Sequence, residues 1–192
     1  MFRKYVLALT LLALPLATLV GTTAAGASQA HTATVTFTGK IDCKIASTSA
    51  ITSKPGLQLL KKAKVTFTIS ATTTKCSGHT SQGGDKIISG KVSASVTGSY
   101  DCLNLLGTLP TLKGSIVWKT SGAPATKTSL TLSAGKVDSK TDVVTYHAGQ
   151  KGSFAGARTM AAKVKQTEAQ LEKACETKAG LTKINLASGS FT

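Results

Sequence analysis

The sequence predicts an all-β fold: an antiparallel β-sandwich, or alternatively a closed barrel, of about eight or nine strands with one short helix near the C-terminus. Two observations predict this class. Apolar residues alternate with polar ones in segment after segment, which is typical of strands with one buried face. Turn signals rich in Gly, Pro, Ser and Asp separate these segments at regular spacing. Alternation also argues against a parallel sheet, whose strands are buried on both faces.

The start of the chain predicts a secretory signal peptide. Arg3 and Lys4 precede an uncharged apolar run, Val6–Val20, and small residues follow it. The run is short for a membrane span, and Pro15 interrupts it. We therefore expect residues 1–30 to be removed and residues 31–192 to form one secreted domain without stable membrane insertion. Three alanines are candidate cleavage sites, the last of them favoured: Ala25, Ala27 and Ala30.

The first strand is expected over Ala33–Ile45, where apolar or small residues occupy every odd position. A second strand, Ala63–Ile69, shows the same period of two. The intervening segment, residues 46–58, contains Pro55 followed by Gly56 and is expected to be a loop.

A glycine-rich loop, Ser77–Asp85, is expected next, followed by a long strand in which Ile88, Gly90 and Val92 share the inward phase. Gly90 is a candidate bulge or bend position. The apolar segment "LNLLGTLP", residues 103–110, is expected to be a loop. Further strands are expected over residues 112–119, 128–134, 143–147, 151–164 with an irregularity at Gly156, and 181–191.

The segment "TEAQLEKACETKAGL", Thr167–Leu181, predicts the short helix. Thr167 and Gln170 have capping-box spacing, and Gly180 suits the end of a helix. Cys175 shares one face with Leu171, so this face is expected to pack inward. The segment is too short to be a stable helix alone, so we expect it to be stapled to the sheet.

The four cysteines are expected to form two disulfides, because an even number in an exported chain favours disulfides over free thiols. Four cysteines allow three pairings. We favour Cys43–Cys76, which joins the ends of neighbouring strands, and Cys102–Cys175, which closes a long loop and pins the helix. The loop-entropy model gives these closures roughly 3.5 and 4.5 kcal/mol as upper values.

Positive charge is the main indication of a partner. After loss of the signal peptide, 21 of the 23 Lys and Arg residues remain, against 8 Asp and Glu, and Arg158 is the only arginine. Because arginine forks and exposed aromatic side chains are the usual marks of nucleic-acid recognition, we expect no nucleic-acid binding. A diffuse lysine surface suits loose attraction to anionic envelope polymers or lipid headgroups. The densest lysines are Lys54, Lys61, Lys62 and Lys64.

Catalytic signals are weak. The chain contains no G-x-S-x-G, H-E-x-x-H or P-loop motif, so we expect no enzyme activity and no cofactor or metal. After cleavage at Ala30 the amine and imidazole of His31 would offer two copper ligands, but a second histidine would have to approach. An enzyme site would need convergence of side chains from a scattered set: His31, His79, Asp85 and His147.

Several segments carry a resemblance to a known group of proteins. The Ala/Thr/Gly-rich signal region is followed by "TGKIDCK", "TTTKCSG", "DCLNLLGTLP", "GSFAGA", "TEAQLEKACETKAGL" and "SGSF". In these features the chain resembles small secreted actinobacterial proteins of unknown function, built from a signal peptide and a four-cysteine β-domain. The resemblance implies a disulfide-bonded β-domain and supplies no catalytic residues.

These observations together predict a secreted, monomeric, non-enzymatic module that binds anionic cell-envelope polymers or surfaces through its lysines. We expect it outside the cell, loosely associated with the wall. The alternatives are a secreted hydrolase or metal-dependent enzyme with a loop-assembled site, and a secreted protease inhibitor. For an inhibitor, "SGHTSQGGD" or "TSGAPAT" would serve as the protruding loop.

Overall fold

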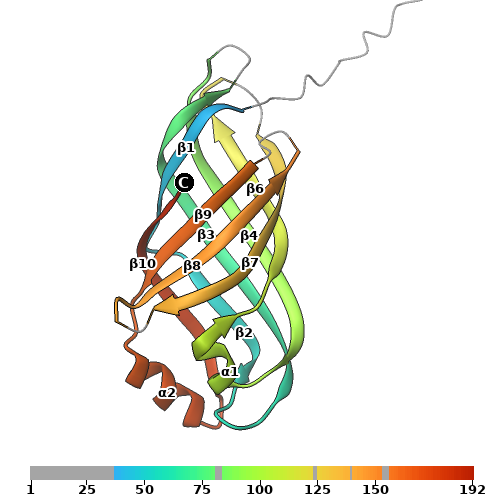
Figure 1. Cartoon of the computed structure of the whole chain (residues 1–192), viewed down its shortest axis with the longest axis vertical. Coiled ribbons are helices and arrows are strands. Elements are labelled where there is room, and N and C mark those ends of the chain that lie inside the picture. Colours follow the sequence, from blue (N-terminus) through green and yellow to red (C-terminus); the bar gives the residue numbers. More distant parts are fainter. Residues whose placement is uncertain (1–36, 81–83, 123–124, 139, 153–155) are drawn as a thin grey trace, which may run out of the picture. The chain divides into compact units, whose positions relative to one another are not determined.

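The structure is a computed structural model that describes residues 37–80, 84–122, 125–138, 140–152 and 156–192. These residues form ten strands of one antiparallel sheet and two short helices (Figure 1). The all-β class, the antiparallel pairing and the helix near the C-terminus are confirmed. The predicted signal peptide, its candidate cleavage sites, His31 and the start of the predicted first strand lie outside the described residues.

Most strands pair with the strand that follows them in the chain, which gives the antiparallel order. The elements are β1 (Phe37–Ile45), β2 (Ala50–Leu57), β3 (Ala63–Thr80), β4 (Ile87–Tyr100), α1 (Cys102–Gly107), β5 (Thr108–Leu109), β6 (Leu112–Thr120), β7 (Thr126–Asp138), β8 (Val143–Lys151), β9 (Gly156–Val164), α2 (Glu168–Glu176) and β10 (Leu181–Phe191).

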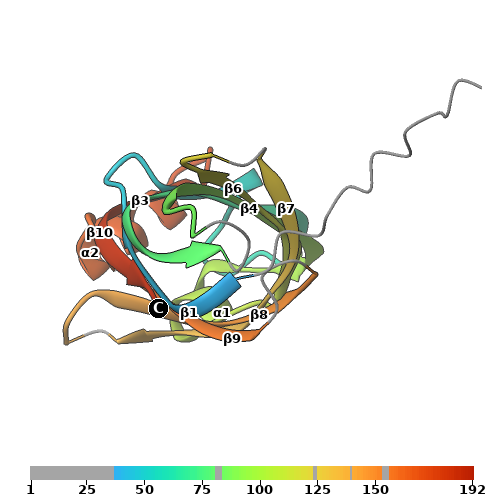
Figure 2. The same ribbon diagram turned by 90° about the horizontal axis from the view of Figure 1, so that it is seen from above.

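The sheet closes on itself through its last strand. β10 pairs with β9 on one side and with both β1 and β2 on the other. β1 and β2 also both pair with β3, so they share one position in the sheet. Seen from above, the strands surround a common interior (Figure 2). Of the two architectures that the sequence leaves open, the pairing follows the closed one, in an irregular form.

The period of two places the apolar side chains inside. Ile41, Cys43 and Ile45 are buried, as the odd-position pattern predicts. The core also contains Trp118, whose ring lies 5.9 Å from that of Phe191 between ring centroids. Burial of these apolar side chains is the main favourable term for this fold.

Several predictions about local structure are wrong, and two of them concern β2 and β4. Residues 46–58 were expected to be a loop, but β2 occupies most of them because it pairs with β3 and β10. Pro55 follows the last residue paired with β3, so its missing N–H disrupts no pair there. Ile88 was expected inside, yet it is 44% exposed and Ile87 is buried instead. A register shift between Ile87 and Ser89 changes the inward phase.

The apolar segment after Cys102, expected to be a loop, contains α1 and β5. Asp101 caps the helix, because its Oδ1 accepts the backbone N–H of Asn104 at 2.9 Å. The Asn104 side-chain amide donates to both carboxylate oxygens of Asp101. Leu105 points into the core and is buried. The apolar run is therefore explained by a short helix that covers one end of the sheet.

Helix α2 forms as the sequence predicts. The backbone N–H of Gln170 donates to Thr167 Oγ1 at 3.3 Å, and the Gln170 side chain accepts the Thr167 N–H at 3.0 Å. The helix itself ends at Glu176. Gly180 has φ = 69° and its N–H donates to the carbonyl of Thr177 at 3.0 Å, so glycine suits this left-handed position.

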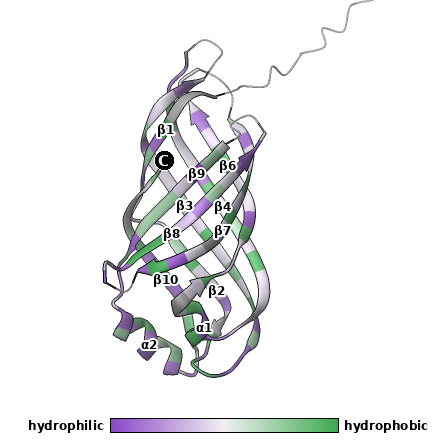
Figure 3. Cartoon of the chain, in the orientation of Figure 1, coloured by the Kyte–Doolittle hydropathy of each residue, from purple (hydrophilic) through white to green (hydrophobic). Residues whose placement is uncertain are grey.

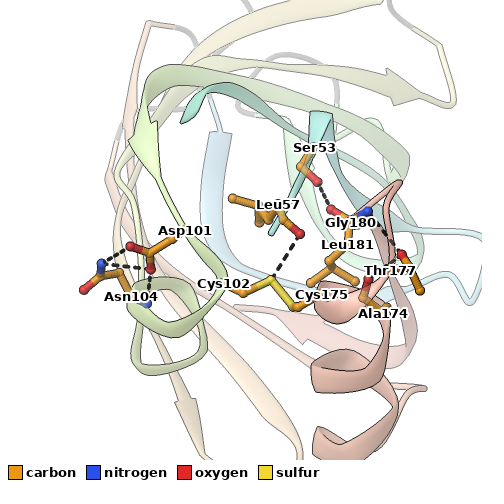
Figure 4. Close-up of a disulfide and its surroundings, with 10 residues drawn as sticks. All are labelled: Ser53, Leu57, Asp101, Cys102, Asn104, Ala174, Cys175, Thr177, Gly180 and Leu181. Carbon is orange, nitrogen blue, oxygen red and sulfur yellow. Dashed lines mark hydrogen bonds between the residues drawn. A yellow bond between two sulfur atoms is a disulfide. The ribbon is translucent and has the colours of Figure 1, made fainter. Parts of the chain in front are cut away.

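Both favoured disulfides are formed. Cys43–Cys76 joins β1 to β3, and Cys102–Cys175 joins α1 to α2 (Figure 4). Beside the second bridge, the buried hydroxyl of Ser53 donates to the carbonyl of Leu181. The two helices, the start of β10 and the end of β2 are thus tied together at one end of the sheet, which we call the α2 end.

Candidate functional site

The four lysines singled out from the sequence lie at the α2 end. Lys54 is on β2, Lys61 and Lys62 lie between β2 and β3, and Lys64 is on β3. All four are exposed, and so is Lys178, which follows α2. We call these five residues the lysine cluster. Density of lysine in the sequence identified four of them, whereas the fifth is separated in sequence and joins them through the fold.

The segment that carries Lys61 is held by the two helices. The backbone N–H of Leu59 donates to the carbonyl of Cys175 at 3.2 Å. The N–H of Cys102 donates to the carbonyl of Gln58 at 3.0 Å, and the Gln58 side chain donates to the carbonyl of Lys178 at 3.2 Å. Three hydrogen bonds therefore hold the segment against α1, α2 and the residues that follow α2. The disulfide between Cys102 and Cys175 joins the two helices to each other.

A hollow of about 530 Å³ lies between this segment and the end of α2. Lys61 and Lys178 line it from opposite elements, together with Leu60 and one acid, Glu176. The five lysines of the cluster outnumber the three exposed carboxylates of α2, Glu168, Glu172 and Glu176, of which Glu176 lines the hollow. An anionic chain or headgroup seated here would meet ammonium groups from both walls.

The scattered catalytic candidates do not form one site among the described residues. His79 and Asp85 belong to the same hairpin, where His79 forms a bridge with Lys86. His147 is on β8, which extends beyond the predicted end of the strand to Lys151. It lines a pocket of about 370 Å³ that neither His79 nor Asp85 lines. In the described part of the chain, no group of three or more His, Cys, Asp or Glu could hold a metal ion.

A second surface, on the outer face of β7, β8 and β9, was not anticipated from the sequence. The pocket of His147 shares Ser133, Gly149 and Ala157 with a neighbouring pocket of about 400 Å³. Hydroxyl side chains and two cations, Lys151 and Arg158, line the two pockets. The sequence feature that could have indicated this surface is the outward phase of Gly149 and Ala157. Because both residues are small, the surface of the sheet is shallowly hollowed there.

The opposite end of the sheet, where β3 ends and β7 begins, contains several buried polar side chains beside the apolar Trp118 and Ile87. We call it the loop end. Thr128 is fully buried and Gln150 is 5% exposed. The Thr128 hydroxyl and both amide atoms of Gln150 have no hydrogen-bond partner among the described residues. A buried polar atom that lacks a partner costs free energy, so Thr128 and Gln150 are positions where a substitution tests the packing of this end.

Hydrogen bonding and burial shift the pKa of two groups in the part of the chain that the structure describes. Burial raises the pKa of the Tyr146 hydroxyl well above its usual range. Hydrogen bonds from the Thr141 side chain and the Lys140 backbone lower the pKa of the exposed Asp138 carboxyl.

Comparison with known proteins found no relative of this chain. No family model, curated protein or solved structure matches the chain. None of the described helices is long and apolar enough to cross a membrane.

Proposed function

We propose that this protein is a secreted, non-enzymatic β-module that binds anionic polymers or surfaces of the cell envelope through the lysine cluster. One observation carries the proposal. Five exposed lysines from β2, β3, the segment between them and the segment after α2 lie at a single end of the fold, and two of them, Lys61 and Lys178, line one hollow. The fold thus adds Lys178 to four lysines that already stand close together in the sequence.

The chemistry of lysine suits an anionic partner that is recognised by its charge and not by the order of its units. An ammonium group is a strongly hydrated point charge, which suits repeated phosphate or carboxylate groups rather than a planar, two-pronged contact. Exposed lysines contribute little each, and salt screens them within about 10 Å at an ionic strength of 0.1 M. Binding is therefore expected to be additive and strongly dependent on salt.

The two disulfides support a location outside the cytosol. Disulfides persist in oxidising compartments and are rare in reducing ones. We propose that the chain is secreted after removal of residues 1–30 and acts as a monomer loosely associated with the wall.

Co-sedimentation with purified cell-wall material tests the proposal. We expect the mature protein to pellet with the wall at low salt and to return to the supernatant on the order of 0.5 M salt, where screening shortens the range of charge. A variant with Lys54, Lys61, Lys62 and Lys64 changed to Gln should remain in the supernatant at low salt. If the variant pellets as well as the wild type does, the lysine cluster is not the binding surface.

A further inference from the structure

Two leucine side chains at the α2 end are exposed beside the lysine cluster. Leu60 is 79% exposed and Leu103, in the first turn of α1, is 54% exposed. The other large apolar side chains found exposed in the described residues are Ile88 at 44% and Val117 at 40%, on β4 and β6. The two most exposed apolar side chains of this set therefore lie at the end that also carries the lysines.

Backbone contacts bring the two leucines to the same end. Gln58, two residues before Leu60, accepts a hydrogen bond from the backbone of Cys102, the neighbour of Leu103. Figure 3 shows hydrophobic colour on α1 and on the connection beside it, with hydrophilic segments close by. The disulfide between Cys102 and Cys175 fixes both supporting elements. Hydrogen bonds and the disulfide thus hold in place the two segments that carry Leu60 and Leu103.

From this juxtaposition we infer that the α2 end docks on an anionic lipid surface, with Leu60 and Leu103 entering the boundary between headgroups and acyl chains. The lysine cluster then contacts the headgroup phosphates. The inference rests on the proposed function, because it assigns a partner to the same site.

The leucines distinguish a lipid surface from a hydrated polymer. Immersion of an exposed leucine in an acyl boundary removes apolar surface from water, which is favourable at about 25 cal/mol per Å². A hydrated anionic polymer offers no such apolar phase. A single weak apolar anchor gives only reversible membrane binding, and adding a polybasic patch stabilises it. Leu60 and Leu103 together with the five lysines provide both kinds of contact.

The acid in the hollow gives the docked state a further test. Glu176 lines the hollow beside Lys61 and Lys178, so its carboxylate would face the same negative surface. Like charges at close range repel, and removing this carboxylate should tighten binding. We expect E176Q to bind anionic vesicles several-fold more tightly, about fivefold if the change equals one exposed lysine near the surface.

The experiment measures partitioning of the mature, disulfide-bonded protein onto vesicles of phosphatidylglycerol and phosphatidylcholine, and onto vesicles of phosphatidylcholine alone. We expect binding only to the anionic vesicles. The double variant L60S/L103S should bind them roughly tenfold more weakly, consistent with loss of partial leucine burial. The matched double variant I88S/V117S removes two exposed apolar side chains elsewhere and should bind like the wild type. Thermal unfolding of both variants checks that each remains folded.

Two outcomes would overturn the inference. If L60S/L103S binds anionic vesicles as the wild type does, the leucines do not enter the surface. If I88S/V117S weakens binding equally, the effect is general and the α2 end is not the docking face. The proposed function can survive either result, because it fails if the wild type does not pellet with cell-wall material at low salt, or if the variant lacking the four lysines pellets as well as the wild type does.

Discussion

The two ends of this closed sheet differ in what they bury and in what they expose. At the α2 end the interior is apolar, with Leu57, Leu105 and Leu181 buried, and two stapled helices cover it. The surface there carries lysines and exposed leucines. At the loop end the interior contains threonines and Gln150, several atoms of which have no partner in the described part of the chain.

The two ends therefore differ in how their buried residues contribute to the stability of the fold. Apolar burial and the long loop closed by Cys102–Cys175 stabilise the α2 end, which carries the lysine cluster. The loop end has its own bridge, Cys43–Cys76, and the buried Trp118, but the Thr128 hydroxyl and the Gln150 amide have no partner there among the described residues, which costs free energy. The following substitutions test how individual residues at the two ends contribute to stability and binding.

Removal of the bridge at the α2 end should have the largest effect. Changing Cys102 and Cys175 together to Ala opens a loop with a sequence separation of 73 residues. The loop-entropy model predicts a loss of up to about 4.5 kcal/mol in the free energy of unfolding. Urea unfolding followed by circular dichroism measures it. A loss below about 1 kcal/mol would mean that α1 and α2 pack firmly without the bridge.

Two leucines on the same helix should differ strongly. Leu105 is 2% exposed and Leu103 is 54% exposed. Leu105→Ala leaves a cavity in the core and should reduce the free energy of unfolding by about 2–5 kcal/mol. Leu103→Ala, as the control on α1, should change it by less than about 0.5 kcal/mol. Equal effects of the two substitutions would contradict the packing of α1 described above.

Two fully buried threonines on β3 and β7 should respond in opposite directions to the same substitution. Thr73 donates a hydrogen bond to the carbonyl of Gly90 at 3.3 Å, whereas the Thr128 hydroxyl has no partner among the described residues. Thr128→Val should raise the free energy of unfolding by about 1 kcal/mol, and Thr73→Val should lower it by a similar amount. Chemical denaturation of both variants measures the contrast. Destabilisation by Thr128→Val would show that its hydroxyl is bonded.

Alkaline pH should weaken the fold through Tyr146. Burial raises the pKa of its hydroxyl in the folded state, while the unfolded chain loses this proton near pH 10. The folded state therefore holds more protons above this pH, so stability is full below about pH 10 and falls as the pH rises further. Tyr146→Phe should reduce this dependence. An unchanged slope in the variant would assign the alkaline loss to other groups.

Much of the fold could be predicted because the sheet has one inner and one outer face. Alternation located most strands, and the capping residues located α2. The failures have physical causes that no local pattern contains. β2 is a strand because β3 and β10 pair with it, although Pro55 and Gly56 read as a turn. The exposure of Ile88 follows from a register shift that depends on β6.

The candidate site was predictable only in part. Four of its lysines stand close together in the sequence, so their density was visible. Lys178 and Leu103 are remote in sequence and reach the same end through long-range contacts, among them the Cys102–Cys175 disulfide and the hydrogen bonds of Gln58. α1 itself was hidden, since six residues are too few to show a clear helical period.

Two variants that lose the same charge, one at each end, test whether the lysine cluster or net charge attracts the partner. One carries Gln at Lys54, Lys61, Lys62 and Lys64. The other carries Gln at four exposed lysines near the loop end: Lys86, Lys119, Lys127 and Lys151. Both lose the same net charge, so a difference in low-salt binding to anionic vesicles and cell-wall material reports position alone. We predict that the first variant loses binding and the second retains most of it. Equal losses in both would show that net charge, rather than the lysine cluster, attracts the partner.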